Sequence, residues 1–328
     1  MKRMIFVAAA TLLAAGVLPT ASAQSLTVTV DCSRGQTIAN ALKQGDSRNP
    51  LIVVVRGTCN EFVSITRNDV SLRADANVGG RINGPDSTRD TILIAASRAQ
   101  IDGLTITGGA TGIRLQSVFD ATVSNTVVEH TADAGLSIRS GYLALSNTTV
   151  QDSGGFGLLL DSGASARVVD SRVLNNSGGG VSLGANCVLR STRTTISGND
   201  GRGGVLAQIG AQAQFSGSEI SNNGADGISA YIGVGIVVNG GSISHNAGRG
   251  VLCNGKCTTQ LSGTEILNNG MEGVLLHMDS MLILLLNAPA STVTGNGGGG
   301  DVNCYDADSS IHHMQLLIGN VNPNCRAF

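Results

Sequence analysis

Several polar side chains that can do chemistry recur at one position of a repeat of about 23 residues. Tyr231 and His277 lie two repeats apart, about 10 Å at the usual spacing of neighbouring strands, and can act as a general acid and base. Arg139 and Arg114 carry planar guanidinium groups, which bind a carboxylate through paired hydrogen bonds. We therefore take Arg139, Tyr231 and His277 as catalytic candidates.

Their neighbours extend the pattern into a stripe. Alternation along the predicted strands places one outward column at Gln116, Arg139, Asp161, Gly184, Gln208, Tyr231, Asn254 and His277. Seven steps make this stripe roughly 30 Å long. The candidate ligand-binding residues are Arg114, Gln116, Asp161, Gln208 and Asn254. A solvated protein face explains the same residues, and Arg139 with Asp161 then forms a surface ion pair of about 0–1 kcal/mol.

The repeat itself predicts the fold. A glycine followed by an apolar residue recurs at 112, 135, 157, 180, 204, 227, 250 and 273, in steps of 22 to 24 residues. A second apolar column keeps the same period, from Ile106 and Val128 to Ile266. Such regular self-similarity is typical of a solenoid. Each unit has room for three short strands separated by turns and for no helix.

Stacking three strands per unit on those of the next unit predicts an all-β, single-domain parallel β-helix with three short parallel sheets, right-handed because parallel crossovers favour that hand. A short amphipathic capping helix is expected over 36–44. Asparagines at 176, 199, 223, 246, 269 and 296 predict a structural ladder in the turns. A column of Thr and Ser (126, 148, 171, 194, 218 and 264) is expected inside, each hydroxyl bonding the next.

Composition narrows the class of protein. Of 328 residues, 41% are hydrophobic and 13% charged, with 45 Gly and a formal net charge of −2. These values argue against intrinsic disorder and against a nucleic-acid partner. A basic start, an apolar run and Ala21-Ser22-Ala23 resemble a secretory signal peptide cleaved after Ala23. We expect a secreted or periplasmic protein with no transmembrane segment, divided into signal peptide (1–23), N-terminal cap (24–50), coils (51–302) and C-terminal cap (303–328).

Seven cysteines suit an oxidising compartment. Local pairing predicts the disulfides Cys32–Cys59, Cys253–Cys257 and Cys304–Cys325, with Cys187 free; buried thiols are the alternative. No Cys or His spacing matches a zinc site, and no cofactor is expected. Calcium is conceivable, but Asp161 has no acidic neighbour in its column.

Gln36-Thr37-Ile38-Ala39-Asn40-Ala41-Leu42 is similar to the capping helix of many right-handed parallel β-helices. Together with the repeat, it makes 31–328 resemble the pectin-lyase-like superfamily, which includes polysaccharide lyases, hydrolases, epimerases and non-catalytic surface proteins. The chain lacks the Asp-Pro-His-Asp motif of mannuronan epimerases and has no Trp for the pectate lyase signatures. The resemblance therefore implies a fold but no particular enzyme family.

Two functions remain open. The first is binding or processing of an extracellular, acidic polysaccharide, by lyase or epimerase chemistry if the protein is an enzyme, with Arg114 and Arg139 holding a uronate carboxylate. The second is a non-catalytic structural or adhesive solenoid. Its protein partner would dock on the leucines of the neighbouring outward column (Leu159, Leu206, Leu252, Leu275) or on Met281–Leu286. The alternative for Met281–Leu286 is that the C-terminal segment covers it.

Overall fold

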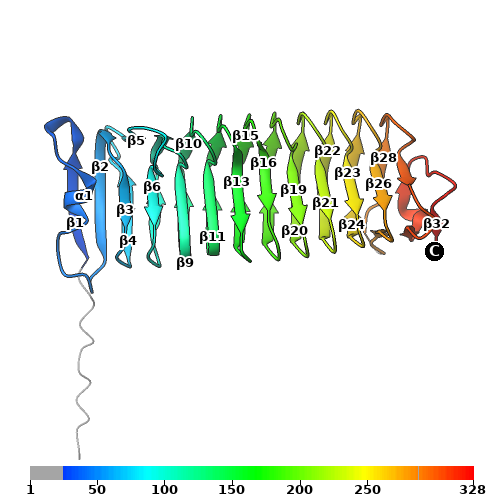
Figure 1. Ribbon diagram of the computed structural model, residues 1–328, viewed down its shortest axis with the longest axis horizontal. Coiled ribbons are helices and arrows are strands. Elements are labelled where there is room, and N and C mark those ends of the chain that lie inside the picture. Colours follow the sequence, from blue (N-terminus) through cyan, green and yellow to red (C-terminus); the bar gives the residue numbers. More distant parts are fainter. Residues whose placement is uncertain (1–24, 287) are drawn as a thin grey trace, which may run out of the picture.

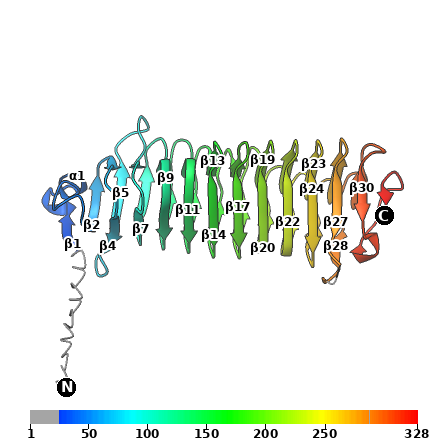
Figure 2. The same ribbon diagram turned by 90° about the horizontal axis from the view of Figure 1, so that it is seen from below.

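The computed structural model describes residues 25–286 and 288–328, so the predicted signal peptide lies outside the described residues. The chain winds into a parallel β-solenoid with about 23 residues per turn (Figure 1). Every strand pairs in parallel with the equivalent strand one coil away, as Ile113 does with Leu136 and Val150 with Val173. The coils follow one another along a single straight axis (Figure 2). The predicted architecture is confirmed.

Three sheets run the length of the solenoid. Sheet one follows the repeated glycine and comprises β3 (Val63–Ile65), β6 (Ile92–Ile94), the first parts of β9 (Ile113–Ser124) and β11 (Leu136–Ser146), β13 (Phe156–Asp161), β16 (Gly179–Leu183), β19 (Val205–Gln208), β21 (Ile228–Tyr231), β23 (Val251–Asn254), β26 (Val274–His277) and β29 (Val302–Cys304).

Sheet two comprises β1 (Leu26–Asp31), the first part of β2 (Leu51–Asn60), β4 (Val70–Ala74), β7 (Gln100–Asp102), the last parts of β9 and β11, β14 (Ser165–Val169), β17 (Val188–Thr192), the first parts of β20 (Gln212–Ser221) and β22 (Gly235–Ser244), β24 (Thr258–Ser262), β27 (Met281–Leu284), β30 (Ser310–His312) and β32 (Arg326–Ala327).

Sheet three comprises the last part of β2, β5 (Gly80–Gly84), β8 (Thr105–Gly108), β10 (Val127–Glu129), β12 (Thr149–Gln151), β15 (Arg172–Leu174), β18 (Thr195–Ser197), the last parts of β20 and β22, β25 (Glu265–Leu267), β28 (Ser291–Thr294) and β31 (Leu317–Ile318). The remaining elements are the short helices η1 (Cys32–Arg34), α1 (Ile38–Ala41) and η2 (Met314–Leu316).

The two repeated columns of the sequence meet in one contact. The apolar column on sheet three, from Val128 to Val293, is fully buried. At each repeated glycine a Cβ would overlap this column: at Gly227 it would lie 2.6 Å from Ile243 Cγ2, and at Gly250 2.4 Å from Ile266 Cγ2. A side chain on the glycine would therefore force the coil open, which explains why the glycine and the β-branched residue recur together.

The helix in the N-terminal cap is shorter than predicted. The sequence predicted helix over 36–44, but α1 is a single turn whose buried face is Ile38 and Ala41. Gly45, with φ of 72°, is left-handed and lets the chain turn away. Ahead of α1, β1 already pairs with β2 in register, so a strand of sheet two lies within the segment assigned to the cap.

The cysteines join as local pairing predicted. Disulfides link Cys32 to Cys59, Cys253 to Cys257 and Cys304 to Cys325. The first ties the chain before α1 to β2, and the last ties β29 to the chain just before β32. Cys187 is free and buried, and desolvation raises the pKa of its thiol.

The asparagine ladder fills the turn between sheets three and one. The first five asparagines are buried, and the Nδ2 of each donates to the Oδ1 of the Asn in the next coil at 2.8 to 3.0 Å. The ladder ends at Asn296, whose backbone N and Nδ2 both donate to the carboxylate of Asp301. These hydrogen bonds join each coil to the next, so the predicted structural role of the ladder is confirmed.

The hydroxyl column is buried as predicted, but its bonding differs. The hydroxyls of Thr126 and Thr148 donate to the carbonyl two residues earlier in their own coil. Between coils, the backbone N of Thr148 donates to the hydroxyl of Ser171, and that of Thr194 to Ser218. The expected hydroxyl-to-hydroxyl chain was wrong, because nearby carbonyls accept the hydroxyl protons first.

A second ladder follows the turn between sheets two and three. The carboxylate of Asp102 accepts hydrogen bonds from Ser124 Oγ and Asn125 Nδ2, both at 2.7 Å, and Asn147 Nδ2 donates to Asn125 Oδ1. The hydrogen bond from Ser124, opposed by burial and helped by Asn125, lowers the pKa of Asp102. The folded state therefore favours the ionised carboxylate.

We predict that Asn223→Ala lowers the free energy of unfolding by roughly 2–3 kcal/mol, because it leaves buried groups without partners. Asn223 Oδ1 accepts from the backbone N and Nδ2 of Asn199, and its Nδ2 donates to Asn246. The measurement is the midpoint of chemical denaturation. Asn40→Ala, on the exposed side of α1, is the matched control and should change little; equal effects would contradict the ladder's role.

We predict that Asp102→Asn lowers the unfolding midpoint at neutral pH and that the difference from wild type disappears in acid. A lowered folded-state pKa adds stability above the unfolded value, near 3.8, and this stability is lost as pH falls through the folded pKa. Denaturation midpoints of both proteins between neutral and acidic pH measure this. A difference that stays constant with pH would show that the charge is not the cause.

Candidate functional site

The strand register of sheet one brings the predicted stripe into one line. Neighbouring coils pair Gln116 with Arg139, Arg139 with Asp161, Gln208 with Tyr231, Tyr231 with Asn254, and Asn254 with His277. All these side chains point outward, because the residue just before each of them on its strand, such as Ile138 before Arg139, is buried in the core. The strand pairing therefore confirms that the residues predicted to share a column lie in one line.

Arg139 and Asp161 lie side by side but form no ion pair within the described part of the chain. Asp161 Oδ1 instead accepts a hydrogen bond from the backbone N of Ser162 at 2.7 Å. Arg139 is exposed and makes no ion pair with a described carboxylate. The surface-pair interpretation is not supported, and the guanidinium of Arg139 is available to a ligand.

Arg114 is engaged by the protein itself. Its Nε lies 2.7 Å from Asp90 Oδ2, and another of its nitrogens donates to Thr111 Oγ1 at 2.9 Å. Only 27% of the Arg114 side chain is exposed. Two of its donors are thus already used, so Arg114 is less suited than Arg139 to bind a carboxylate.

The neighbouring outward column is largely covered rather than an exposed stripe, and its Leu206 and Ser229 form the floor of a hollow. Its leucines at 206, 252 and 275 are only 7 to 8% exposed. The turns that lead into sheet one rise beside this floor, and the hollow that they bound has a volume of about 390 Å³. Its lining includes Arg202, Leu206, Asp226, Ser229, Tyr231 and Met271. The leucine column therefore offers a partner little surface, since Leu206, Leu252 and Leu275 are buried and Leu159 is only partly exposed.

Tyr231 and His277 flank this floor with Asn254 between them in the same column. The ring of His277 meets the ring of Tyr305 edge-on, with 4.7 Å between centroids. Tyr305 was not predicted as part of the site, although it follows Cys304, which pairs with Leu276. Together these side chains offer one hydroxyl, one amide, one imidazole and an additional aromatic ring.

A charged cluster lies where three successive coils enter sheet one. Arg249 contacts Asp226 Oδ1 at 3.6 Å and Glu272 Oε2 at 3.2 Å, and both acids are 9% exposed. Ser229 Oγ donates to Asp226 Oδ2 at 2.9 Å, and both residues line the hollow, so the cluster borders it. Our sequence analysis missed this cluster. The sequence feature that could have revealed the cluster is that each of its three charged residues directly precedes a repeated glycine.

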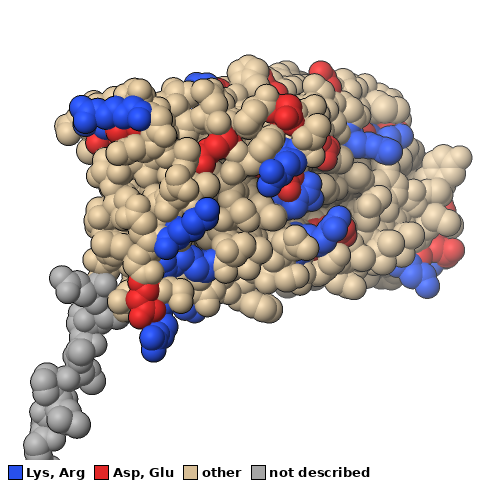
Figure 3. All heavy atoms as spheres, turned by 60° about the vertical axis from the view of Figure 1, so that its left-hand side comes forward, with Lys and Arg blue, Asp and Glu red and all other residues tan. Residues whose placement is uncertain are grey.

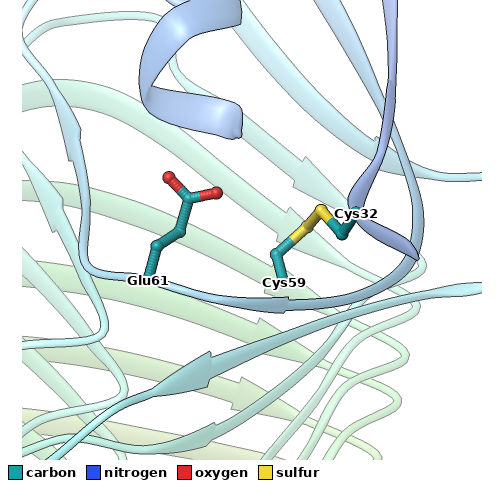
Figure 4. A group of neighbouring side chains, drawn as sticks. All are labelled: Cys32, Cys59 and Glu61. Carbon is teal, nitrogen blue, oxygen red and sulfur yellow. A yellow bond between two sulfur atoms is a disulfide. The ribbon is translucent and has the colours of Figure 1, made fainter. Parts of the chain in front are cut away.

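Elsewhere, charges occur in small mixed groups on a largely uncharged surface, and most basic side chains in view lie against acidic ones (Figure 3). The group of Cys32, Cys59 and Glu61 has the proximity of a metal site (Figure 4). Its sulfurs are joined in a disulfide, and the carboxylate of Glu61 accepts hydrogen bonds from the backbone N of Ile38 and Ala39. This group therefore serves the cap of α1 and does not fit a metal ion.

The apolar segment Met281–Leu286 belongs to the solenoid. Leu282 and Leu284 of β27 are buried in the core, and β30 of the C-terminal segment pairs with β27. Leu286 is 56% exposed. The C-terminal strand thus continues the sheet beside this segment. Within the described residues, no helix is long and apolar enough to cross a membrane.

We predict that Arg249→Ala lowers the free energy of unfolding by roughly 1–3 kcal/mol, because two largely buried carboxylates lose their counter-ion. The estimate stays below that of a fully buried pair since 24% of the Arg249 side chain is exposed. Denaturation midpoints measure the change. Arg202→Ala, an exposed arginine on the same hollow, should stay within about 0.5 kcal/mol; a similar loss in both variants would contradict this assignment.

Known structures share this fold. The A-module of the Azotobacter vinelandii mannuronan C-5 epimerase AlgE4 is 14% identical, with a TM-score of 0.67 over 88% of this chain and 90% of that one. The periplasmic alginate epimerase AlgG is 12% identical, with a TM-score of 0.54 over 92% and 82%. The enzymatically active domain of tailspike protein 2 of bacteriophage CBA120 is 12% identical, with a TM-score of 0.55 over 80% and 43%.

At these identities the likeness concerns the fold alone, and no curated protein matches the chain in sequence. A family model for the right-handed β-helix region matches residues 90–206 and 180–300, which together make up more than half of the chain. The matched region spans the glycine repeat, the asparagine ladder and the hollow. The chain therefore belongs to the right-handed β-helix family.

Proposed function

We propose that the protein binds an extended, acidic polysaccharide outside the cytoplasm along the outer face of sheet one. The observation that carries the proposal is the line of polar side chains beside a hollow of about 390 Å³. A linear glycan can lie along this line, because its sugars repeat at a spacing close to that of the strands, about 4.8 Å. Three disulfides suit an oxidising compartment.

The groups around the hollow suit a sugar. Leu206 and Met271 in the lining offer apolar surface for a ring face. Tyr231 and Ser229 offer hydroxyl groups to its edge, and the amide of Asn254 follows Tyr231 in the stripe. Such a mixture of apolar surface and few polar groups is common in small-molecule sites. Arg139 and Arg202 supply cations that are free of described carboxylates, and this favours a glycan that carries carboxylates.

In its catalytic form the proposal assigns acid–base chemistry to Tyr231 and His277. One group removes the proton from the carbon next to a uronate carboxylate. Elimination of the glycosidic oxygen, protonated by the other group, then gives a lyase, whereas return of a proton from the opposite face gives an epimerase. Arg139 stands four coils before Tyr231 in the stripe, so it would hold a sugar further along the chain.

The second candidate is a non-catalytic adhesive or structural solenoid, which binds through its faces without turnover. The near-constant coil length favours it, since the repeated glycines are 22 to 24 residues apart and no long loop raises a second wall over the hollow. The engagement of Arg114 by Asp90 favours it as well. Both candidates share binding and differ in turnover.

We predict that the double variant Tyr231→Ala/His277→Ala binds polygalacturonate and alginate at least roughly tenfold more weakly than wild type, because side chains at the centre of an interface dominate affinity. Calorimetric titration of the purified protein measures this. Phe119→Ala, which removes an aromatic ring that is 71% exposed and lies away from the hollow, is the control.

The same samples test turnover. A rise of the unsaturated-uronate absorbance with wild type, reduced about 10²–10⁴-fold in Tyr231→Phe, would establish the lyase. Binding without turnover leaves the adhesive solenoid as the function. Unchanged affinity in Tyr231→Ala/His277→Ala, or an equal loss in Phe119→Ala, would reject sheet one as the binding face.

A further inference from the structure

We propose that the outer face of sheet two is a second binding track, which takes a carboxylated polysaccharide at Arg167 and Arg190. The proposal shares the class of ligand with the proposed function and differs from it in place. These two faces of the solenoid are separated by the turns after sheet one. A single chain of sugars cannot contact both in the same coils, so the two tracks are independent sites.

Arg167 and Arg190 are paired across neighbouring strands. The register of β14 and β17 places the two residues directly opposite each other, and Gln214 of β20 follows in the next coil. Both arginines are exposed, and their neighbours along the strands, such as Ala166 and Leu189, are buried. Two guanidinium groups therefore project side by side from one sheet face.

No described carboxylate compensates these two charges. Arg193, three residues after Arg190, is paired with Asp170 at 2.7 Å. Neither Arg167 nor Arg190 has an acidic oxygen within ion-pair distance in the described chain. Like charges directly opposite each other on a sheet are destabilising. A bound polyanion removes this repulsion, and guanidinium groups bind carboxylates with a planar fork.

Two adjoining hollows extend along this face from Arg190 toward the C-terminal coils. A hollow of about 140 Å³ is lined by Arg190 and Gln214, and the adjoining one, of about 240 Å³, by Lys256 and Gln260. They share Gln212, Gly235 and Val237. At Gly235 a Cβ would lie 2.2 Å from Gln212 Oε1, so the missing side chain is what lets this amide lie along the sheet.

The spacing of the donors matches a polymer rather than a small anion. In Figure 2 the strands β14, β17, β20, β22 and β24 follow one another along the solenoid. Successive side chains of the column are therefore about 4.8 Å apart, close to the length of one sugar in an extended chain. A polyuronate presents one carboxylate per sugar, and two consecutive carboxylates can meet Arg167 and Arg190 while Gln214 and Gln260 bond hydroxyls.

The test compares binding of polygalacturonate, with neutral dextran as the uncharged probe, by calorimetric titration at two salt concentrations. We expect wild type to bind polygalacturonate in two steps, and Arg167→Ala/Arg190→Ala to weaken one of them roughly tenfold, with loss of most of the salt dependence of that step. Arg48→Ala/Arg172→Ala removes the same charge from exposed positions elsewhere and should bind like wild type. The thermal midpoint without ligand should not fall in Arg167→Ala/Arg190→Ala, because only exposed, mutually repelling groups are removed.

The site variants separate this proposal from the one on sheet one. Loss of one binding step in Arg167→Ala/Arg190→Ala and of the other in Tyr231→Ala/His277→Ala would support both tracks. Loss in Arg167→Ala/Arg190→Ala alone would support sheet two and reject sheet one, and the reverse would do the opposite. Wild-type affinity in Arg167→Ala/Arg190→Ala overturns the second track. So does an equal loss in Arg48→Ala/Arg172→Ala, since the effect would then be one of net charge.

Discussion

Each coil depends on one close approach, between a glycine that has no Cβ and the β-branched side chain that enters the space above it. At Gly227 a Cβ would overlap both Ile243 and the carbonyl oxygen of Gly250 in the next coil. This contact sets how tightly sheet three folds back onto sheet one and how closely the coils stack. The core is filled mainly by aliphatic residues, namely Val, Ile, Leu and Ala, with Phe215 the largest fully buried side chain.

The same contact shapes the surface. The turn that precedes each glycine must end beside sheet one, so its residues rise next to the outward leucines and convert a flat sheet into a floor with one wall. Asp226, Arg249 and Glu272 occupy the last position of three such turns and neutralise each other in part. The hollow is thus a by-product of how the coil closes, and its polar groups follow the period of the fold.

Much of this molecule could be predicted because the repeat makes one coil a template for the others. The stripe from Gln116 to His277 was predictable since strand alternation and a near-constant coil length fix both direction and register. The burial of Leu206, Leu252 and Leu275 was not, because alternation tells outward from inward and says nothing about the turn that covers an outward residue. The pairing of Arg114 with Asp90 and the short α1 likewise depend on irregular loops, where the period gives no guidance.

The asparagine ladder gives the solenoid a direction of its own. In each link one amide N–H donates to the Oδ1 of the next Asn toward the C-terminus, while the other N–H donates to a backbone carbonyl of the preceding coil. The Oδ1-to-Nδ2 direction is the same in every link, so the amide dipoles add along the axis as peptide dipoles do in a helix. The carboxylate of Asp301 accepts from the last amide and places a negative charge at the positive end of this row. The ladder stops at this charge, although the strands β29, β30 and β31 that follow Asp301 add one more coil. Coils inserted within the ladder keep the row intact, so the length of the solenoid can vary in its interior while its C-terminal end stays fixed.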